Sequence, residues 1–269
     1  MNIEKIKITE LNILLAFDKT CRTLGMKYSL SSGTLLGAIR HKGYIPWDDD
    51  IDVMMVREEY EKFIKEGPRV LSRHFFVQTY ETDSFYPLNF CKLRDTGTDL
   101  KDKRTANLDM KHGVSIDIFP VDRISNDRVV RNFVNRLVIC ILAVKFACTK
   151  EWAATSKIKK ARKWSFLLTP LARLIGTKKL NQAETWIRKT GNRAKNQMTF
   201  ADNTDLGAIL KKKDAVMPIT LFKTYDEVEF EGNNFMAISD WDEYLTHMYG
   251  DYMTPPPLEE RLSTHQCYE

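Results

Sequence analysis

The segment GYIPWDDDIDVMM, residues 43–55, constrains the fold of this chain more than any other stretch. Four aspartates fall within five positions, directly beside Ile51, Val53, Met54 and Met55. Apolar side chains of this kind normally lie inside a protein, whereas an unpaired carboxylate is costly to remove from water. The fold must therefore bring something to this segment that compensates its charge.

Four interpretations of the aspartates compete. A solvated surface patch is disfavoured by the apolar flanks. A calcium loop would use Asp48, Asp50, Asp52 and Glu59 as its first, third, fifth and twelfth positions, but Val53 stands where the loop needs glycine. A structural cluster paired with Lys or Arg stays open. The fourth interpretation, a catalytic metal site, has the best geometry.

On a strand, Asp50 and Asp52 point to one face and Asp49 to the other. Neighbouring carboxylates repel unless a cation or proton lies between them, and Mg²⁺ (or Mn²⁺) is bound by one or two carboxylates plus phosphate oxygens. Asp48 lies just upstream, and Asp117 lies between two isoleucines of a second predicted strand. Asp50, Asp52 and Asp117 are therefore the predicted catalytic residues, and with Asp48 they are the predicted metal ligands.

A strand-to-helix turn, SSGTLLG at residues 31–37, offers backbone N–H groups at a helix N-terminus, which is a natural phosphate cradle. Lys92 and Arg94 alternate on one face of CKLRD and either hold phosphate or are solvated charges on an edge strand. The candidate residues for donor phosphate are Ser32, Gly33, Thr34, Arg40, Lys92 and Arg94.

Periodicity predicts an α/β (α+β) fold with a mixed sheet core flanked by helices. Helices are expected over 9–25, from about 34, over 57–67 and over 240–250, and strands over 27–29, 51–56, 74–80, 87–95 and 113–121. A hairpin over 224–238 is expected to turn at Gly232-Asn233. Residues 1–125 are predicted to form the catalytic core, 126–200 a basic helical region, and 201–269 a hairpin and helix that complete the core.

The basic helical region holds an unusual charge. Residues 145–195 contain fourteen Lys or Arg and two acids, although the whole chain has a net charge of only +5. This stretch is either a solvated helical face or a contact with an anionic membrane, to which the apolar run Trp164–Gly176 would add. The N-terminus does not read as a signal peptide, and the five scattered cysteines favour a reducing compartment. A cytoplasmic protein, peripheral at the inner face of the membrane, is expected.

Four blocks of sequence resemble the LicD family of bacterial phosphocholine transferases, which are related to the fukutin-type ribitol-phosphate transferases. They are SSGTLLGAIRHKGYIPWDDDIDVMM, KLRDTGT, GVSIDIFPVD and YGDYMTPPPLEER, and they fall between residues 30 and 261. The resemblance implies a nucleotidyltransferase-like fold, a divalent metal and a CDP-choline or related CDP-alcohol donor. It also implies a glycan or lipid-linked glycan acceptor, such as lipopolysaccharide or teichoic acid, and no nucleic-acid partner.

Aromatic faces bind a quaternary ammonium well. The candidates for choline or base contacts are Tyr44, Trp47, Tyr86 and Phe90, each of which is otherwise a core residue. Arg261 and His265 are candidate C-terminal contacts. Two other functions stay open: a nucleotidyl transferase that moves an NMP group with release of pyrophosphate, and a non-catalytic nucleotide-binding member of the fold.

Overall fold

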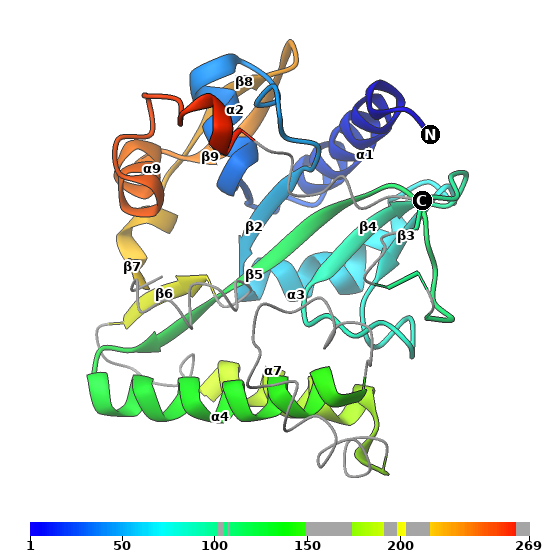
Figure 1. Cartoon of the computed structure of the whole chain (residues 1–269), viewed down its shortest axis with the longest axis vertical. Coiled ribbons are helices and arrows are strands. Elements are labelled where there is room, and N and C mark those ends of the chain that lie inside the picture. The colour runs from blue at the N-terminus through cyan, green and yellow to red at the C-terminus, as the bar shows by residue number, and fades with distance from the viewer. Residues whose placement is uncertain (102–104, 107, 149–173, 191–197, 203–215, 262–269) are drawn as a thin grey trace.

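The computed structural model describes residues 1–101, 105–106, 108–148, 174–190, 198–202 and 216–261 (Figure 1). None of the helices in these ranges has the length and apolar character needed to cross a membrane. His265 and most of the apolar run 164–176 lie outside the described residues, so the predictions made for them stay predictions. The proposed division into three regions also stays a prediction.

A mixed sheet forms the centre of the molecule and has seven strands within the described residues. Five of them lie in the order β1–β2–β5–β4–β3, with β6 added to the far part of β5 and β7 to β6 (Figure 1). Their bounds are β1 Ser29–Leu30, β2 Asp52–Val56, β3 Phe75–Gln78, β4 Cys91–Asp95, β5 Ser115–Ser125, β6 Met198–Asp202 and β7 Val216–Pro218. Only the β2–β5 pair is parallel among these pairings. The mixed α+β architecture is as predicted.

Two helices cover one face of this sheet, α1 (Ile3–Thr23) and α3 (Arg57–Glu66). Phe17 of α1 meets Phe63 of α3 with ring centroids 5.0 Å apart, so the two helices share this face. Val53 of β2 and Ile118 of β5 are fully buried members of the core. Because side chains alternate along a strand, the neighbours of Val53 and Ile118 project from the opposite face. A short 3-10 helix, η1 (Gly67–Arg69), follows α3.

A second group of elements adjoins the β1 edge of the sheet. It contains α2 (Ser32–His41), the hairpin β8 (Tyr225–Phe230) and β9 (Asn233–Ile238), and α9 (Trp241–Tyr249), at the upper left of Figure 1. The 3-10 helices η3 (Ile219–Phe222) and η4 (Leu258–Glu260) lie before the hairpin and after α9. The main chain of β9 joins β1 through a hydrogen bond from Ile238 N to Ser29 Oγ at 3.0 Å.

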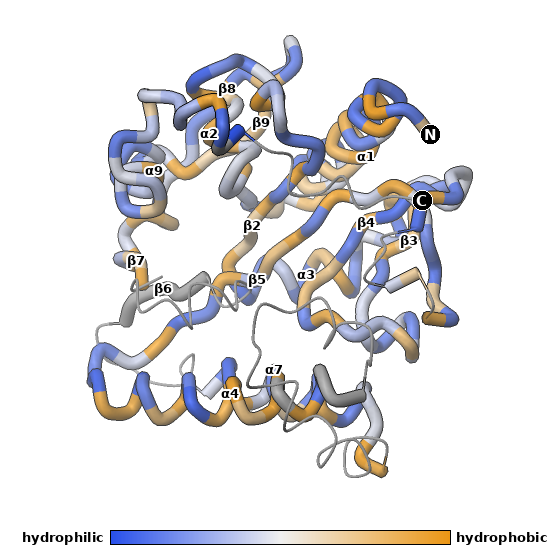
Figure 2. Tube along the Cα trace, in the orientation of Figure 1, coloured by the Kyte–Doolittle hydropathy of each residue, from blue (hydrophilic) through white to orange (hydrophobic). Residues whose placement is uncertain are grey.

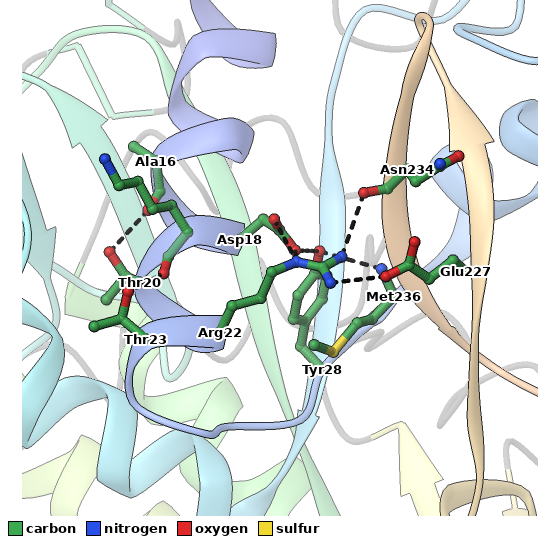
Figure 3. A network of polar contacts seen from close by, with 10 residues as sticks. Ala16, Asp18, Thr20, Arg22, Thr23, Tyr28, Glu227, Asn234 and Met236 are labelled. Atoms are coloured by element: carbon green, nitrogen blue, oxygen red, sulfur yellow. Dashed lines mark hydrogen bonds and ion pairs between the residues drawn. The ribbon is translucent and has the colours of Figure 1, made fainter.

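A polar network holds this hairpin to α1 (Figure 3). Arg22 donates to both carboxylate oxygens of Asp18 at 2.8 Å and to Glu227 of β8 at 2.7 Å. The Tyr28 hydroxyl donates to Asp18 at 2.7 Å and accepts from Met236 N of β9 at 3.3 Å. The network fixes the hairpin, and through it the β1–α2 turn, relative to the sheet.

Helices α4 (Arg128–Cys148) and α7 (Thr177–Thr190) pack together at the opposite end of the molecule (Figure 1). Between them, the Glu184 carboxylate accepts from Lys145 Nζ and from Arg188 Nη2, each at 2.7 Å. All three side chains are buried. Two of the basic residues that the sequence assigned to a solvated or membrane-facing surface therefore neutralise a buried acid instead.

Several predicted boundaries are wrong, three of them with a clear structural reason or consequence. The first helix begins at Ile3, because Asn2 rather than Thr9 caps it by accepting from Lys5 N at 3.0 Å. The hairpin turns at Glu231-Gly232, where φ is +50° and +71°. Strand β2 begins at Asp52, one residue later than expected. The helices predicted over the described parts of 126–196 are confirmed.

Candidate active site

Three charged side chains lie side by side across the centre of the sheet, on the face that α1 and α3 leave uncovered. The strand register places Asp52 of β2 opposite Asp117 of β5, and Asp117 opposite Lys92 of β4. Lys92 Nζ forms an ion pair with the Asp117 carboxylate. Residues opposite one another on neighbouring strands project to the same face, so this row brings two acids and one base together.

The other aspartates of the cluster precede β2. Because Asp50 lies before the strand, strand alternation does not place its side chain as predicted. Its carboxylate is nevertheless close enough to the row to feel the charge of Asp117 and to hydrogen-bond with Asp48. Asp49 is fully buried. The structure thus gathers Asp48, Asp50, Asp52 and Asp117 at one place, as the sequence predicted.

The buried acids of the cluster repel one another. Burial, followed by the charge of Asp117, raises the pKa of Asp50 to about 6. Burial, followed by the charges of Asp50 and Asp117, raises the pKa of Asp52 well above its usual range. Glu10 of α1 is buried nearby, and burial and the Asp50 charge raise its pKa as well. A bound cation would relieve this repulsion.

The N-terminus of α2 lies against the cluster. Ser31 N donates to Asp52 O at 3.0 Å, and Thr34 Oγ1 accepts from Asp52 N at 2.8 Å. A Cβ atom built on Gly33 would lie 2.4 Å from the Asp48 carboxylate, so only glycine permits this approach. Ser32 adopts φ of +47°, a strained value for a residue with a side chain. The turn is therefore locked to β2 and to Asp48.

Sequence reasoning missed Tyr244 of α9. Its buried hydroxyl accepts from Ser32 N at 3.2 Å and hydrogen-bonds with Ser31 Oγ at 3.1 Å. One N–H group of the predicted phosphate cradle is thus already occupied by this tyrosine. The residue sits in an ordinary amphipathic helix, and no spacing in the sequence distinguishes it from a core tyrosine.

The predicted phosphate-binding side chains have different surroundings. Arg94 is buried and donates to Gln78 and, at 2.6 Å, to Gly113 O. It lies on β4, an inner strand, so the alternative of a solvated charge on an edge strand is wrong for both Lys92 and Arg94. Arg40 donates to Tyr252 O at 2.6 Å at the end of α2. Of the three basic side chains, Lys92 is the one in the acidic row.

The aromatic candidates do not form a common cage in this structure. Lys7 Nζ lies 4.7 Å from the centroid of the Tyr44 ring, and Arg261 Cζ lies 5.0 Å from the centroid of the Trp47 ring. Arg261, a predicted C-terminal substrate contact, therefore covers the ring of Trp47, a predicted choline contact.

Two other aromatic candidates lie near the row of charges. The centroid of the Phe90 ring lies 5.6 Å from Lys92 Nζ. Tyr86 is fully buried, and its hydroxyl has no hydrogen-bond partner among the described residues. Burial, followed by the charge of Asp117, raises the pKa of this hydroxyl. Tyr86 is thus an unpaired donor beside the acidic row.

Residues 25–134 match the family described as LicD/FKTN/FKRP, nucleotidyltransferase domain. The lipopolysaccharide cholinephosphotransferase LicD of Haemophilus influenzae (strain ATCC 51907 / DSM 11121 / KW20 / Rd) is 30% identical over 98% of this chain and 96% of its own length. The chain belongs to the LicD family.

The resemblance recognised in the sequence is therefore confirmed. An uncharacterised protein of Rickettsia prowazekii (strain Madrid E) shares 56% identity over 34 residues, which is 13% of this chain and 13% of that protein. The family match spans the α2 turn and the acidic row, from β1 to β5. In this LicD-family chain, the matched segment and the candidate site thus coincide.

The residues of the site fit the divalent metal that the family resemblance implies. No described group of three His, Cys, Asp or Glu side chains is arranged as a ready metal site. Mg²⁺, however, commonly takes only one or two protein carboxylates and completes its shell with water and substrate phosphate. Asp52 and Asp117 on neighbouring strands supply such a pair, and burial together with the charges of neighbouring acids raises the pKa of Asp50 and of Asp52.

Proposed function

We propose that this chain transfers phosphocholine, or a similar phospho-alcohol, from a CDP-alcohol to a hydroxyl group of a cell-surface glycan or its lipid-linked precursor, with release of CMP. The named activity of the Haemophilus relative, matched along nearly its whole length, supports the choice of phosphocholine. The observation that carries the proposal is the row of Asp52, Asp117 and Lys92 beside the α2 turn.

A divalent cation held by Asp52 and Asp117, with Asp50 and Asp48 in support, would neutralise the diphosphate of the donor and the charge that develops during transfer. The remaining roles belong to residues of the chain. Lys92 pairs with Asp117 in the structure, and in the proposed reaction it would contact a phosphate oxygen of the donor.

The α2 turn is proposed to orient the donor. Backbone N–H groups at the start of a helix favour an anion, and the Ser32–Tyr244 hydrogen bond holds the turn in its strained conformation. Tyr86 is fully buried on the Asp117 side of the site, and its hydroxyl has no hydrogen-bond partner among the described residues. Asp117 is either a metal ligand or the acceptor of the proton of the attacking hydroxyl.

Product analysis tests the proposal. The purified protein is incubated with Mg²⁺, CDP-choline and a glycan fraction from the source cells, and nucleotides are separated by liquid chromatography. We expect CMP, formed only when acceptor and metal are present, and no turnover after exhaustive EDTA treatment. Pyrophosphate release from an NTP would instead identify a nucleotidyl transferase. Metal and nucleotide binding without turnover would identify a non-catalytic member of the fold.

A further inference from the structure

Helix α4 carries an apolar surface that nothing in the described structure covers. Val129 and Phe133 are 77% and 62% exposed, and Val130 and Leu137 are also exposed. Val129, Phe133 and Leu137 recur every four residues and therefore share one face of the helix. Figure 2 shows hydrophobic residues along the edge of α4 that faces away from the sheet. We call Val129, Val130, Phe133 and Leu137 the α4 stripe.

The other face of α4 is fixed to the protein. Val138 and Lys145 are buried, and Lys145 is tied to Glu184 of α7 by the ion pair described above. The helix therefore cannot turn its stripe inward without breaking a buried ion pair and exposing Val138. The outward orientation of the α4 stripe is a consequence of how the two helices pack.

The charges around the stripe are mainly basic. Helix α4 contains Arg128, Arg131, Arg136 and Lys145 and no acidic residue. Lys145 is buried and helical spacing puts Arg131 on the side of Val138, so the exposed Arg128 and Arg136 are the basic residues that border the stripe. One acid, Asp127, lies at its N-terminal end, where its carboxylate accepts from Val129 N at 2.7 Å. A helix with an apolar face and a basic border is suited to lie in the plane of an anionic bilayer surface.

We propose that α4 docks this protein on an anionic membrane, with the α4 stripe in the interfacial layer and its arginines against lipid phosphates. A second copy of the chain fits this surface less well. A symmetric contact through the same face would bring Arg128 and Arg136 of both copies together, and Asp127, the acid that precedes each helix, already caps its own helix. The proposal rests on the proposed function only in that a lipid-linked acceptor would place the substrate at the same surface.

The proposal moves the predicted membrane contact from residues 145–195 to α4. Of that stretch, Lys145 and Arg188 are buried in ion pairs with Glu184. Four lysines of the stretch, Lys157, Lys159, Lys160 and Lys163, lie outside the described residues and serve as a separate arm of the test.

Co-sedimentation with vesicles tests the docking without any substrate. The full chain is mixed with vesicles of phosphatidylglycerol and phosphatidylcholine, and with vesicles of phosphatidylcholine alone. We expect binding to the anionic vesicles at low salt, where charges act over about 30 Å, and loss near 1 M salt, where they act over about 3 Å. Val129→Glu with Phe133→Glu should abolish binding. Arg128→Gln with Arg136→Gln should weaken it about fivefold for each arginine removed.

The matched control is Ile8→Glu with Leu15→Glu, which changes two exposed apolar residues of α1, at the far side of the molecule from α4 (Figure 1). This variant should bind vesicles like the unmodified protein. Circular dichroism verifies that the three double variants are folded. A dye on Cys140 of α4, which is exposed, in a chain with Cys148 and Cys267 replaced by serine, should shift to the blue when anionic vesicles are added.

Three results would overturn the proposal. The first is that the unmodified protein does not bind anionic vesicles at low salt. The second is that the α4 variants bind as well as the control, while replacing the four lysines by glutamate abolishes binding. The third is that sedimentation equilibrium shows a dimer that the α4 substitutions dissociate. Each of these results is independent of CMP release. A protein that binds vesicles through α4 yet makes no CMP would contradict the proposed function alone.

Discussion

Replacing Asp52 by asparagine should stabilise the cation-free protein. The substitution keeps the shape of the side chain but removes a buried carboxylate whose pKa is raised by burial and by the charges of Asp50 and Asp117. Two unit charges about 5 Å apart, roughly the spacing of neighbouring strands, repel by about 3 kcal/mol at an effective dielectric constant of about 20. Because Asp117 is also paired with Lys92, we expect a gain of about 1 to 3 kcal/mol in the free energy of unfolding.

The assay is urea unfolding at neutral pH in EDTA and in excess Mg²⁺. Unmodified protein should gain stability from the cation, by about 2.7 kcal/mol when the free cation is about 100 times its dissociation constant. The Asp52→Asn variant should gain little. In EDTA, the raised pKa of Asp50 means that the folded state binds more protons than the unfolded state between about pH 4 and pH 6, so stability should fall as pH rises through this range.

Asp122 provides the matched control on β5. Its buried carboxylate accepts from Arg57 Nε and Nη2, each at 2.6 Å, so its charge is compensated. Asp122→Asn should therefore destabilise the protein by about 3 to 5 kcal/mol, the usual effect of breaking a buried ion pair. If Asp52→Asn also destabilises the protein in EDTA and keeps the full response to Mg²⁺, the account of Asp52 as a crowded metal-binding acid is refuted.

Four further substitutions provide additional tests. Asp117→Asn should lower kcat by at least about a hundredfold, while Asp49→Asn should have a milder effect; equal losses in a kcat measurement would contradict the assigned roles. Gly33→Ala should lower activity by displacing the Asp48 carboxylate, with far-ultraviolet circular dichroism unchanged, and full activity would show that this approach is unnecessary. Burial would raise the pKa of Glu184, but the charges of Lys145 and Arg188 lower it to about 2. The ionised Glu184 carboxylate therefore stabilises the fold above about pH 4.5, and this stabilisation is lost as pH falls toward 2. Glu184→Gln should flatten that part of the stability–pH curve and cost about 3 to 5 kcal/mol at pH 7.

Much of the site could be predicted because its signals are local. The alternation of acids and apolar residues in IDV and SIDIF indicates buried strands with carboxylates on one face, and the structure places Asp52 opposite Asp117. Gly33 was predicted to lie in a strand-to-helix turn, but the sequence could not identify Asp48 as the group that approaches it. Periodicity also identified the helices, because their buried faces recur at helical spacing.

The rest depended on contacts between distant segments. Lys92 pairs with Asp117 because β4 lies next to β5, a neighbour relation that periodicity does not encode. Tyr244 reaches Ser31 from a helix more than two hundred positions away. The stretch of basic residues looked uniform in sequence, yet Lys145 is buried against Glu184 because α4 and α7 pack together. Each of these outcomes is decided by the tertiary fold.

The most direct test of the central claim is mass spectrometry of surface glycans from a strain that lacks this protein. The account predicts that a phosphocholine or similar phospho-alcohol substituent of the parent strain disappears, returns with the unmodified chain, and stays absent when Asp52→Asn or Asp117→Asn is supplied instead. Glycans that are identical in the deletion strain and its parent, or full restoration by the Asp117→Asn chain, would contradict the claim.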